Sequence, residues 1–361
     1  MQRKKTFIWE QNAKEVCQCI QDSPTLFRII LKTKDEEKLI EKWICHYTKI
    51  VKHPTDIIIF DNMSTNKTVL DIYRKYEDRI TLIKYSSHFN SIHDHSVFSD
   101  LYSALLNSSK FYTLIDTDEF LYFYDGKRAI DGIQITAVLE QSKHVSFFPT
   151  FWLKNAYFKE TLFSFKACLE YVQYLLVMGK PIICSEKMKS SVIGALAHTL
   201  QLPISMYGEA PTCFLLLHLS TLSKEHRIRV NMDKLVQYKA IKHSRDFFTA
   251  LNVDIESIGS QNARYFIKEI RKLLALPDSP PEHINPDHLE LLPDGTLRFY
   301  HPEGEKLFNS YANKNTSLFD ILKLDRHSFA NANTILWELY DKDSYLQKSP
   351  PQNKWEFESP I

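Results

Sequence analysis

Strand-like and helix-like segments alternate at regular intervals between residues 26 and 115, and this alternation constrains the fold more than any other feature of the chain. Short apolar runs typical of buried strands occupy residues 26–31, 56–60, 80–85 and 111–115. Between them, apolar side chains recur at helical spacing over residues 39–50, 69–76 and 97–106. Strands that alternate with helices in this way form right-handed crossovers. The sequence therefore predicts an α/β domain with a mainly parallel central sheet.

The pattern continues less regularly beyond this region. It predicts a helix over 131–141, strands over 145–148 and 213–217, and helices over 223–238 and 263–276, whereas residues 151–212 fit no clear pattern. A proline-rich segment at 277–281 resembles a linker, and Asp294-Gly295 between apolar runs predicts a hairpin. We expect three parts: an N-terminal extension over 1–24, the α/β domain over 25–245, and a C-terminal helical and hairpin region of unknown role over 246–361.

Composition excludes several classes of protein. The 45 Lys and Arg against 44 Asp and Glu leave a net charge of +1, which argues against a nucleic-acid-coating protein. Neither G-x-G-x-x-G nor the Walker motif occurs, which excludes the usual NAD enzymes and P-loop NTPases. The six cysteines lack zinc spacing and fit reduced thiols, and no apolar run is long enough to span a bilayer. We expect a cytoplasmic protein, with peripheral attachment to the cytoplasmic face of the membrane as an alternative.

Acidic residues follow three of the four predicted strands, where an open α/β sheet binds its ligands. Asp35 and Glu36 follow the first, Asp61 the second, and Asp116 and Asp118 the fourth. Residues i and i+2 of a strand point to the same side, so the last two carboxylates can converge. Such a pair binds Mg²⁺ or Mn²⁺ together with a substrate diphosphate. The alternative is that these aspartates only cap the turn or helix that follows.

Three motifs in order then resemble the GT-A glycosyltransferases similar to family 2. They are KTKDE at 32–36, DNMS at 61–64 and DTDEF at 116–120, and the resemblance spans about residues 25–240. It implies a GT-A type nucleotide-sugar-binding domain that moves a hexose or hexosamine from a nucleotide sugar to a glycan or glycolipid acceptor. UDP is the expected nucleotide. The family usually has an aspartate at the position of Asn66, so no catalytic role is assigned to Asn66.

The resemblance also implies roles for individual residues. Thr33, Asp35 and Glu36 would border the nucleotide base, Asp61 with Asn62 would contact uracil or ribose, Asp116 would meet the ribose or the metal, and Asp118 would bind the metal that bridges the phosphates. His218 opens a segment similar to the family's H-x-x-x-x-S-x-E and would complete the metal shell. Taken alone, His218 could equally be a core histidine. An imidazole ligand favours Mn²⁺ over Mg²⁺.

Charged residues downstream supply the remaining candidates. Lys234, with Arg227 and Arg229, could neutralise the leaving diphosphate, or could lie on a solvated helix face. Transfer with inversion, which the resemblance favours, needs a carboxylate base near the acceptor hydroxyl. Glu160 and Glu209 are the candidates, with a surface position as the alternative for each. A retaining enzyme would need neither.

The biological setting and the rival functions rest on analogy. An excess of lysine over arginine is typical of an AT-rich bacterial genome, which suggests lipooligosaccharide, lipopolysaccharide or capsule synthesis. The helix at 263–276 could lie on the inner membrane surface or pack on its own domain. A sugar-nucleotide pyrophosphorylase would need a glycine-rich loop after the first strand, and the loop at 33–36 contains no glycine. A HAD-type phosphatase would carry D-x-D-x-[TV] after its first strand, whereas the D-x-D of this chain follows the fourth and continues with Glu119 and Phe120. A non-catalytic nucleotide-sugar-binding relative and the oligomeric state stay open.

Overall fold

The fold is described from a computed structural model of the chain. The described residues are 6–93, 97–142, 145, 147–166, 179–185, 211, 213–243, 251–252, 254–276 and 284–312.

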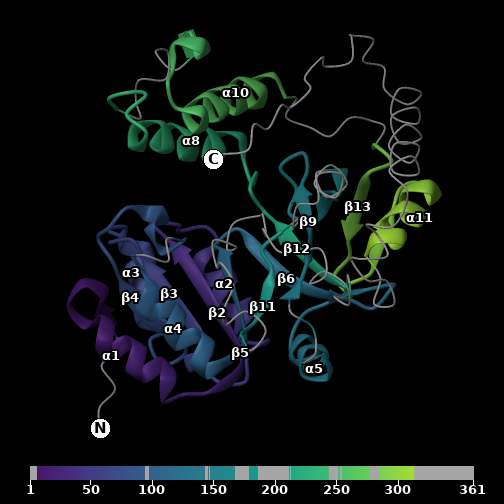
Figure 1. The fold of residues 1–361 in the computed structure, drawn as a ribbon. Coiled ribbons are helices and arrows are strands. Elements are labelled where there is room, and N and C mark those ends of the chain that lie inside the picture. The colour runs from purple at the N-terminus through teal and green to yellow at the C-terminus, as the bar shows by residue number, and fades with distance from the viewer. Residues whose placement is uncertain are drawn as a thin grey trace.

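A central sheet organises the first half of the chain (Figure 1). Its strand order is β1-β4-β3-β2-β5-β11-β8. The strands are β1 (Thr6–Ile8), β4 (Thr81–Lys84), β3 (Ile57–Asp61), β2 (Thr25–Thr33), β5 (Ser109–Asp116), β11 (Ile182–Cys184) and β8 (Phe147–Phe148). The first five are parallel to one another, and β11 runs antiparallel to both of its neighbours.

Strands β2, β3 and β5, which precede the predicted acidic site residues, are neighbours in this sheet. β2 pairs in parallel with β3 on one side and β5 on the other. The structure therefore confirms the predicted α/β fold class with a mainly parallel central sheet.

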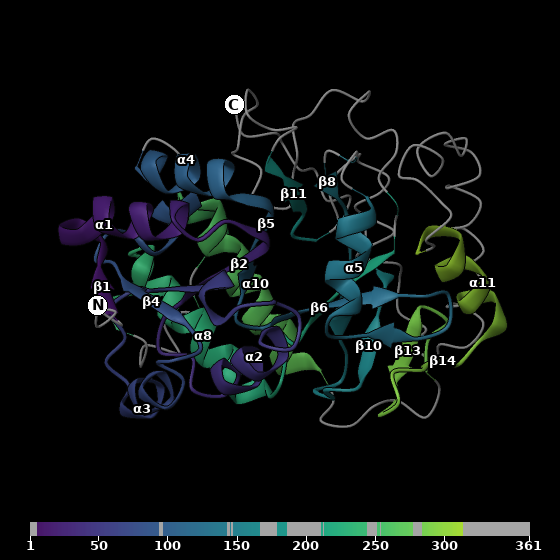
Figure 2. The same ribbon diagram turned by 90° about the horizontal axis from the view of Figure 1, so that it is seen from below.

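Helices cover both faces of the central sheet because its strands are apolar on both sides. Ile29 and Ile59 point to the face covered by α2 (Ile40–Tyr47) and α3 (Lys67–Lys75). Ile30 and Ile58, one residue along, point to the face covered by α1 (Trp9–Gln21) and α4 (Ser99–Ser108). Figure 2 shows the two helix layers on opposite sides of the strands.

The N-terminal residues belong to the same layers. β1 pairs with β4, and α1 packs against α4 through Trp9, whose ring stacks on Phe98 at a centroid distance of 4.8 Å. Residues 6–21, which the sequence sets apart as an extension, thus complete the sheet edge and one helix layer. The pairing joins residues more than seventy positions apart, so no local pattern announces it.

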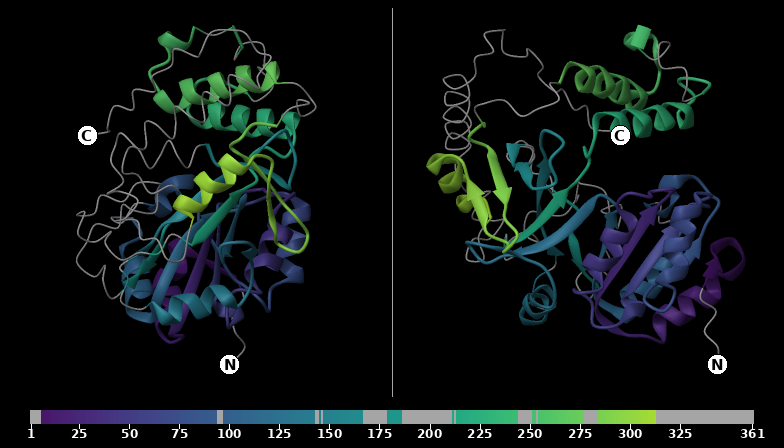
Figure 3. Two further views of the ribbon diagram at one scale, coloured as in Figure 1. Left: turned by 90° about the vertical axis from the view of Figure 1, so that its right-hand side faces the viewer. Right: turned by 180° about the vertical axis from the view of Figure 1, so that it is seen from behind.

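A second sheet, in the order β14-β13-β10-β9-β12-β6-β7, stands beside the first (Figure 3). Its strands are β14 (Leu297–Phe299), β13 (His288–Leu291), β10 (Leu162–Ser164), β9 (Thr150–Asn155), β12 (Phe214–His218), β6 (Glu119–Tyr124) and β7 (Ala129–Ile130). Helix α5 (Gln134–Gln141) follows β7. The predicted hairpin at Asp294-Gly295 is confirmed, since β13 and β14 pair antiparallel. Because β13 also pairs with β10, this sheet crosses the predicted boundary at residue 245.

Two helices, α8 (Lys224–Gln237) and α10 (Gln261–Ala275), pack on each other beyond one end of the sheets (Figure 3). The apolar stripe of α10, with Ala263, Ile267 and Ile270, is buried against Met232 and Leu235 of α8. Of the two alternatives for this helix, a position on a membrane surface or packing within the protein, the structure shows the second. Within the described ranges, no helix has the length and apolar character needed to cross a membrane.

Three short 3-10 helices and a last α-helix complete the described elements. They are Pro54–Asp56, Phe89–His93, Ile255–Ser257 and α11 (Pro302–Tyr311). Gly304 lies in the first turn of α11 and packs directly on the Pro286 main chain, which leaves no space for a side-chain Cβ.

Candidate functional site

The carboxyl ends of β2, β3 and β5 bring the predicted ligand-binding residues to one edge of the central sheet. Thr33 pairs in register with Asp61, and Lys32 pairs with Asp116. The edge is where an open α/β sheet binds its ligands. The Thr33 hydroxyl is buried there and has no hydrogen-bond partner among the residues that the structure describes.

Asp61 is fully buried and its carboxylate is engaged within the protein. Oδ2 accepts a hydrogen bond of 2.9 Å from the Ser64 amide, and Oδ1 accepts one of 3.1 Å from the Tyr73 hydroxyl and another from the Ser64 hydroxyl. Burial, with the nearby Asp61 charge, raises the pKa of Tyr73 well above its ordinary value, so the hydroxyl stays a donor. Asn62 donates from Nδ2 to the carbonyl oxygens of Tyr85 and Ser87. These contacts hold the turn after β3 in place.

The loop after β2 is fastened to this turn. Asp35 has a φ of 48°, a left-handed conformation that aspartate tolerates better than most residues. Its Oδ1 accepts from the amides of Thr65 at 2.7 Å and Asn66 at 2.8 Å, and its own amide donates to Ser64 Oγ at 2.8 Å. Asn66 in turn caps α3, since its side chain accepts from the amides of Thr68 and Val69. Asp35 thus positions the loop by binding backbone amides.

The acidic turn at 116–119 joins the two sheets, because β5 ends at Asp116 and β6 begins at Glu119. Asp116 contacts two buried lysines that the sequence analysis missed. Lys180 Nζ lies 3.0 Å from Oδ2 and Lys32 Nζ lies 3.6 Å from Oδ1, with side-chain exposures of 5% and 6%. Burial lowers the pKa of Lys32. Burial acts on Lys180 in the same direction, but Asp116 and Glu119 outweigh it and raise the pKa of Lys180.

Glu119 also received no predicted role, although it lies inside the DTDEF motif at 116–120. Its side chain is buried and accepts a 3.0 Å hydrogen bond from the Asp116 amide. Burial raises the pKa of Glu119 to about 8, against the attraction of Lys180. Burial thus favours the protonated form of this carboxyl group, and Lys180 favours the ionised form.

Asp118 and His218 form a pair at the end of β12. His218 Nε2 lies 3.0 Å from Asp118 Oδ2, and the imidazole stacks on Trp152 at a centroid distance of 4.6 Å. Burial lowers the pKa of His218. Burial opposes ionisation of Asp118, but the contact with His218 outweighs it and holds the pKa of Asp118 below its ordinary value. His218 Nδ1 has no hydrogen-bond partner in the described part of the chain.

Helix α8 brings further cationic and imidazole groups over this turn. Arg227 is held by Glu269 of α10 through contacts of 3.0 and 3.2 Å, and Lys234 Nζ lies 5.0 Å from the centre of the Phe266 ring. Burial lowers the pKa of Lys234, and the charge of Arg227 acts in the same direction while Asp118 opposes it. Both cations are thus fixed between the helices near the acidic turn, in place of the solvated helix face that the sequence also allowed.

Glu36 of the loop after β2 meets the same helix. His226 Nε2 lies 3.7 Å from Glu36 Oε2. Burial, together with the charge of Lys38, lowers the pKa of His226 to about 4, and burial raises the pKa of Glu36. The imidazole is therefore neutral near pH 7, and the contact helps close α8 over the loop without a full ion pair.

Of the two predicted catalytic bases, the structure describes Glu160 alone, and Glu160 lies outside this cluster. Glu160 forms an ion pair of 2.5 Å with Lys42, half-exposed, and lines a different cavity. Glu209 lies outside the described residues. Of the predicted site residues, Thr33, Asp35, Glu36, Asp61, Asn62, Asp116, Asp118, His218 and Lys234 gather around the carboxyl edge and the acidic turn.

The donor groups at the acidic turn meet the needs of a divalent cation in part. Asp118 and His218 are suitable donor types and lie side by side, but His218 Nε2 is bonded to Asp118 and the unpartnered Nδ1 is on the other side of the ring, so both would bind one ion only after the imidazole releases Asp118. Asp116 does not fit as it stands, since both of its oxygens face lysine ammonium groups. Among the described residues, no group of three or more His, Cys, Asp or Glu side chains is arranged to hold a metal ion.

No protein-family model and no curated protein matches the chain. Solved structures do show a likeness. S. aureus TarS has 12% identity and a TM-score of 0.33, covering 76% of this chain and 60% of TarS, so the chain spans three fifths of that protein. TarS 1–349 in complex with UDP-GlcNAc has 13% identity and a TM-score of 0.33 over 90% and 93% of the two chains. The mannosyltransferase PcManGT from Pyrobaculum calidifontis, in complex with GDP-Man and Mn²⁺, has 12% identity and a TM-score of 0.32 over 91% and 89%.

Proposed function

We propose that the chain is a glycosyltransferase that binds a nucleotide-sugar donor at the carboxyl edge of the central sheet. The proposal rests on the Asp118–His218 pair at the acidic turn. The buried Lys32 and Lys180 contact this turn, and Arg227 and Lys234 of α8 lie near it. A diphosphate needs both positive charge and a coordinating cation, and this cluster offers donor groups for each.

Asp118 and His218 would hold the divalent cation, and Mn²⁺ suits them better than Mg²⁺ because one ligand is a nitrogen. When bound, the ion neutralises charge on the diphosphate that leaves. Lys234 and Arg227 face the same turn and would bind the departing diphosphate from the helix side. Lys32 and Lys180 hold the Asp116 carboxylate in place, so we assign Asp116 a positioning role toward the ribose or the turn itself.

The finer assignments come from the resemblance of the sequence motifs. We propose UDP as the nucleotide, a hexose or hexosamine as the sugar, a glycan or glycolipid as the acceptor, and inversion at the anomeric carbon, in the synthesis of a bacterial surface polysaccharide or lipooligosaccharide. Glu160 is paired with Lys42 outside the cluster, so Glu209 is the carboxylate we propose as base. Glu160→Gln and Glu209→Gln distinguish the two candidates. Only the variant that lacks the base should lose sugar transfer while it still binds the donor.

Donor binding is tested by thermal melts with UDP in the presence and absence of Mn²⁺. We expect Mn²⁺-dependent stabilisation by UDP in the wild type and its loss in Asp118→Ala, because a ligand that binds only the folded state raises the melting temperature. Asp71→Ala is the matched control, since Asp71 is exposed on α3 and contacts only Arg74 there. Unchanged stabilisation in Asp118→Ala would refute the metal-binding role.

Catalysis is tested separately by measuring nucleotide release from a panel of nucleotide sugars with Mn²⁺, with and without a glycan acceptor. Turnover identifies the donor, and the anomeric configuration of the product decides between inversion and retention. Mn²⁺-dependent binding of UDP without turnover of any donor would instead identify a non-catalytic nucleotide-sugar-binding protein.

A further inference from the structure

A cavity of about 700 Å³ lies on the face of the second sheet opposite the acidic turn. In the pairing of β6 with β12, Glu119 stands beside His218, and Phe120 stands beside Leu217. Adjacent residues of a strand point to opposite faces. Phe120 and Leu217 line the cavity, whereas Glu119 and His218 belong to the acidic turn. The volume falls within the range of small-molecule sites, roughly 300 to 1,000 Å³.

The wall formed by the β13–β14 hairpin is held in place before any ligand binds. The Ala129 amide of β7 donates to the Gly295 carbonyl oxygen at 2.8 Å. Gly295 has a φ of 84° and lies so close to the Ala129 carbonyl oxygen that a Cβ would collide with it. Both segments line the cavity, which is therefore preformed between β7, the hairpin and α2.

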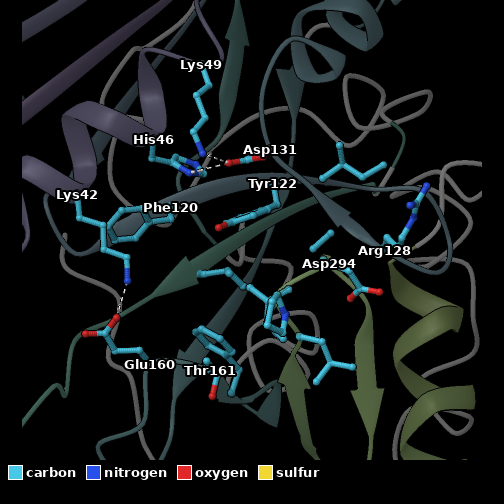
Figure 4. A pocket seen from close by; sticks show the side chains of 18 of the residues that line it. Lys42, His46, Lys49, Phe120, Tyr122, Arg128, Asp131, Glu160, Thr161 and Asp294 are labelled. Atoms are coloured by element: carbon cyan, nitrogen blue, oxygen red, sulfur yellow. Dashed lines mark hydrogen bonds and ion pairs between the residues drawn. The ribbon is translucent and has the colours of Figure 1, made fainter.

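Charged side chains stand around the cavity in balanced numbers. Lys42 pairs with Glu160 at 2.5 Å, and Lys49 pairs with Asp131 at 3.0 Å. Arg128 and Asp294 supply one further charge of each sign, so the lining carries three of each. Figure 4 shows Lys42 with Glu160 at one edge of the cavity and Lys49 with Asp131 at another, where a further dashed line joins Asp131 to His46. A lining without net charge does not select an anion such as a nucleotide.

Aromatic rings form the wall between these pairs. Phe120 and Tyr122 project from β6 toward the cavity, with His46 against both rings at centroid distances of 5.4 and 5.0 Å (Figure 4). Burial lowers the pKa of His46 to about 4, so the imidazole adds no charge near neutral pH. Tyr122 is only half-buried, and its ring offers a face to a bound molecule.

We propose that this cavity binds a neutral saccharide, at a site separate from the donor site. A sugar ring has one apolar C–H face, which packs on an aromatic wall, and hydroxyl groups that both donate and accept hydrogen bonds. A carboxylate accepts hydrogen bonds from sugar hydroxyls, and an ammonium group donates hydrogen bonds to them. Each ion pair at the rim therefore offers a sugar both an acceptor and a donor. A lipid chain would require an apolar lining, and six charged side chains exclude it.

Cys45 provides a reporter for the cavity. Cys45 is exposed and belongs to the lining of the cavity, and its Sγ lies 3.2 Å from the Tyr76 hydroxyl. Cys19 on α1 is also exposed but takes no part in the lining. The full chain is alkylated with iodoacetamide in the presence of maltose, lactose, cellobiose or diacetylchitobiose, and the rate at each cysteine is followed by peptide mass spectrometry. A saccharide present at about ten times its Kd slows alkylation of Cys45 about tenfold, because only the empty cavity reacts.

We expect at least one of these disaccharides to protect Cys45 without protecting Cys19. Tyr122→Leu should remove the protection, and Tyr265→Leu, at an exposed ring on α10, should retain it. Lys49→Gln, at a side chain that is 61% exposed, gives a second variant with little effect on folding and should weaken protection. Protection by none of the disaccharides, or protection that Tyr122→Leu and Lys49→Gln both leave unchanged, would overturn the proposal.

The donor site is tested by an independent arm. Asp118→Ala should lose Mn²⁺-dependent stabilisation by UDP and still show protection of Cys45 by saccharide. If the wild type shows no effect of UDP but Cys45 is protected, the proposed donor site fails and the saccharide cavity stands. If UDP with Mn²⁺ protects Cys45 and no disaccharide does, the cavity belongs to the nucleotide and the proposal is refuted.

Discussion

The burial of His46 predicts that the protein loses stability as the pH falls below neutral. His46 is 6% exposed, and its Nε2 donates a 2.9 Å hydrogen bond to the Leu121 carbonyl oxygen, which links α2 to β6. Burial lowers the pKa of His46 to about 4, although Asp131 opposes the shift. An exposed histidine in the unfolded chain titrates at about 6.5.

The sign and size follow from proton linkage. Because the pKa in the folded state lies below that in the unfolded state, the unfolded chain takes up a proton below about pH 6.5 that the folded protein does not bind until about pH 4. Stability from this group is present above pH 6.5 and is lost as the pH falls toward 4. Between pH 7 and pH 5 the loss amounts to about 2 kcal/mol, using 1.36 kcal/mol per unit of pKa difference.

His46→Gln isolates this effect. The glutamine amide can still donate to the Leu121 carbonyl oxygen but does not titrate, so the variant should lose about 2 kcal/mol less than the wild type between pH 7 and pH 5. The measurement is urea-induced unfolding at both pH values, followed by far-UV circular dichroism. His218 and His226 also have a lowered pKa because of burial, but they are present in both proteins and cancel in the comparison.

His53→Gln is the matched control, because the His53 side chain is exposed on the surface. It should lose the same free energy of unfolding as the wild type over this pH interval. Equal losses for His46→Gln and the wild type would refute the reasoning, since they would mean that His46 takes up its proton in the folded state as readily as in the unfolded chain.

Three further predictions concern packing, capping and charge. Gly304→Ala should destabilise the protein by roughly 1–3 kcal/mol in urea unfolding, although alanine favours helices, because its Cβ would collide with the main chain of the preceding loop; Gly259→Ala, into open space, should not. Asn66→Ala should cost about 1 kcal/mol through loss of the α3 cap. Asn66→Ser keeps a capping oxygen but, like alanine, gives up the 2.8 Å hydrogen bond from Asn66 Nδ2 to Glu37, so it should cost less than alanine; an equal cost for both would contradict the capping role. Lys180→Met should cost about 3 kcal/mol, because it removes one of the two buried lysines that pair with Asp116, and adding Asp116→Asn should recover part of the loss. No recovery in this double-mutant cycle would show that the charges are not coupled.

The sequence was sufficient for the parallel middle of the central sheet, strands β4, β3, β2 and β5, and for the edge where their acidic residues meet. The apolar runs of β2, β3 and β5 and the helical stripe that contains Trp43 are local patterns, and burial on both faces of a parallel sheet demands such runs. Parallel strands also share one carboxyl edge, so Asp61 and Asp116 could be placed near each other before any coordinates were known. The Asp294-Gly295 turn is equally local, since glycine supplies the positive φ.

Only the tertiary structure decided what the side chains at that edge contact. Lys180 comes from a segment with no clear pattern, and it reaches Asp116 because β11 adds to β5 as an antiparallel strand. The pairing of β1 with β4 and of β10 with β13 likewise joins distant segments, whose register depends on which edges the assembled sheets leave open. Asp61 holds its own turn in place, and burial raises the pKa of Glu119. Periodicity reports which face of an element is apolar, whereas hydrogen-bond partners and pKa values depend on neighbours that folding brings together from far along the chain.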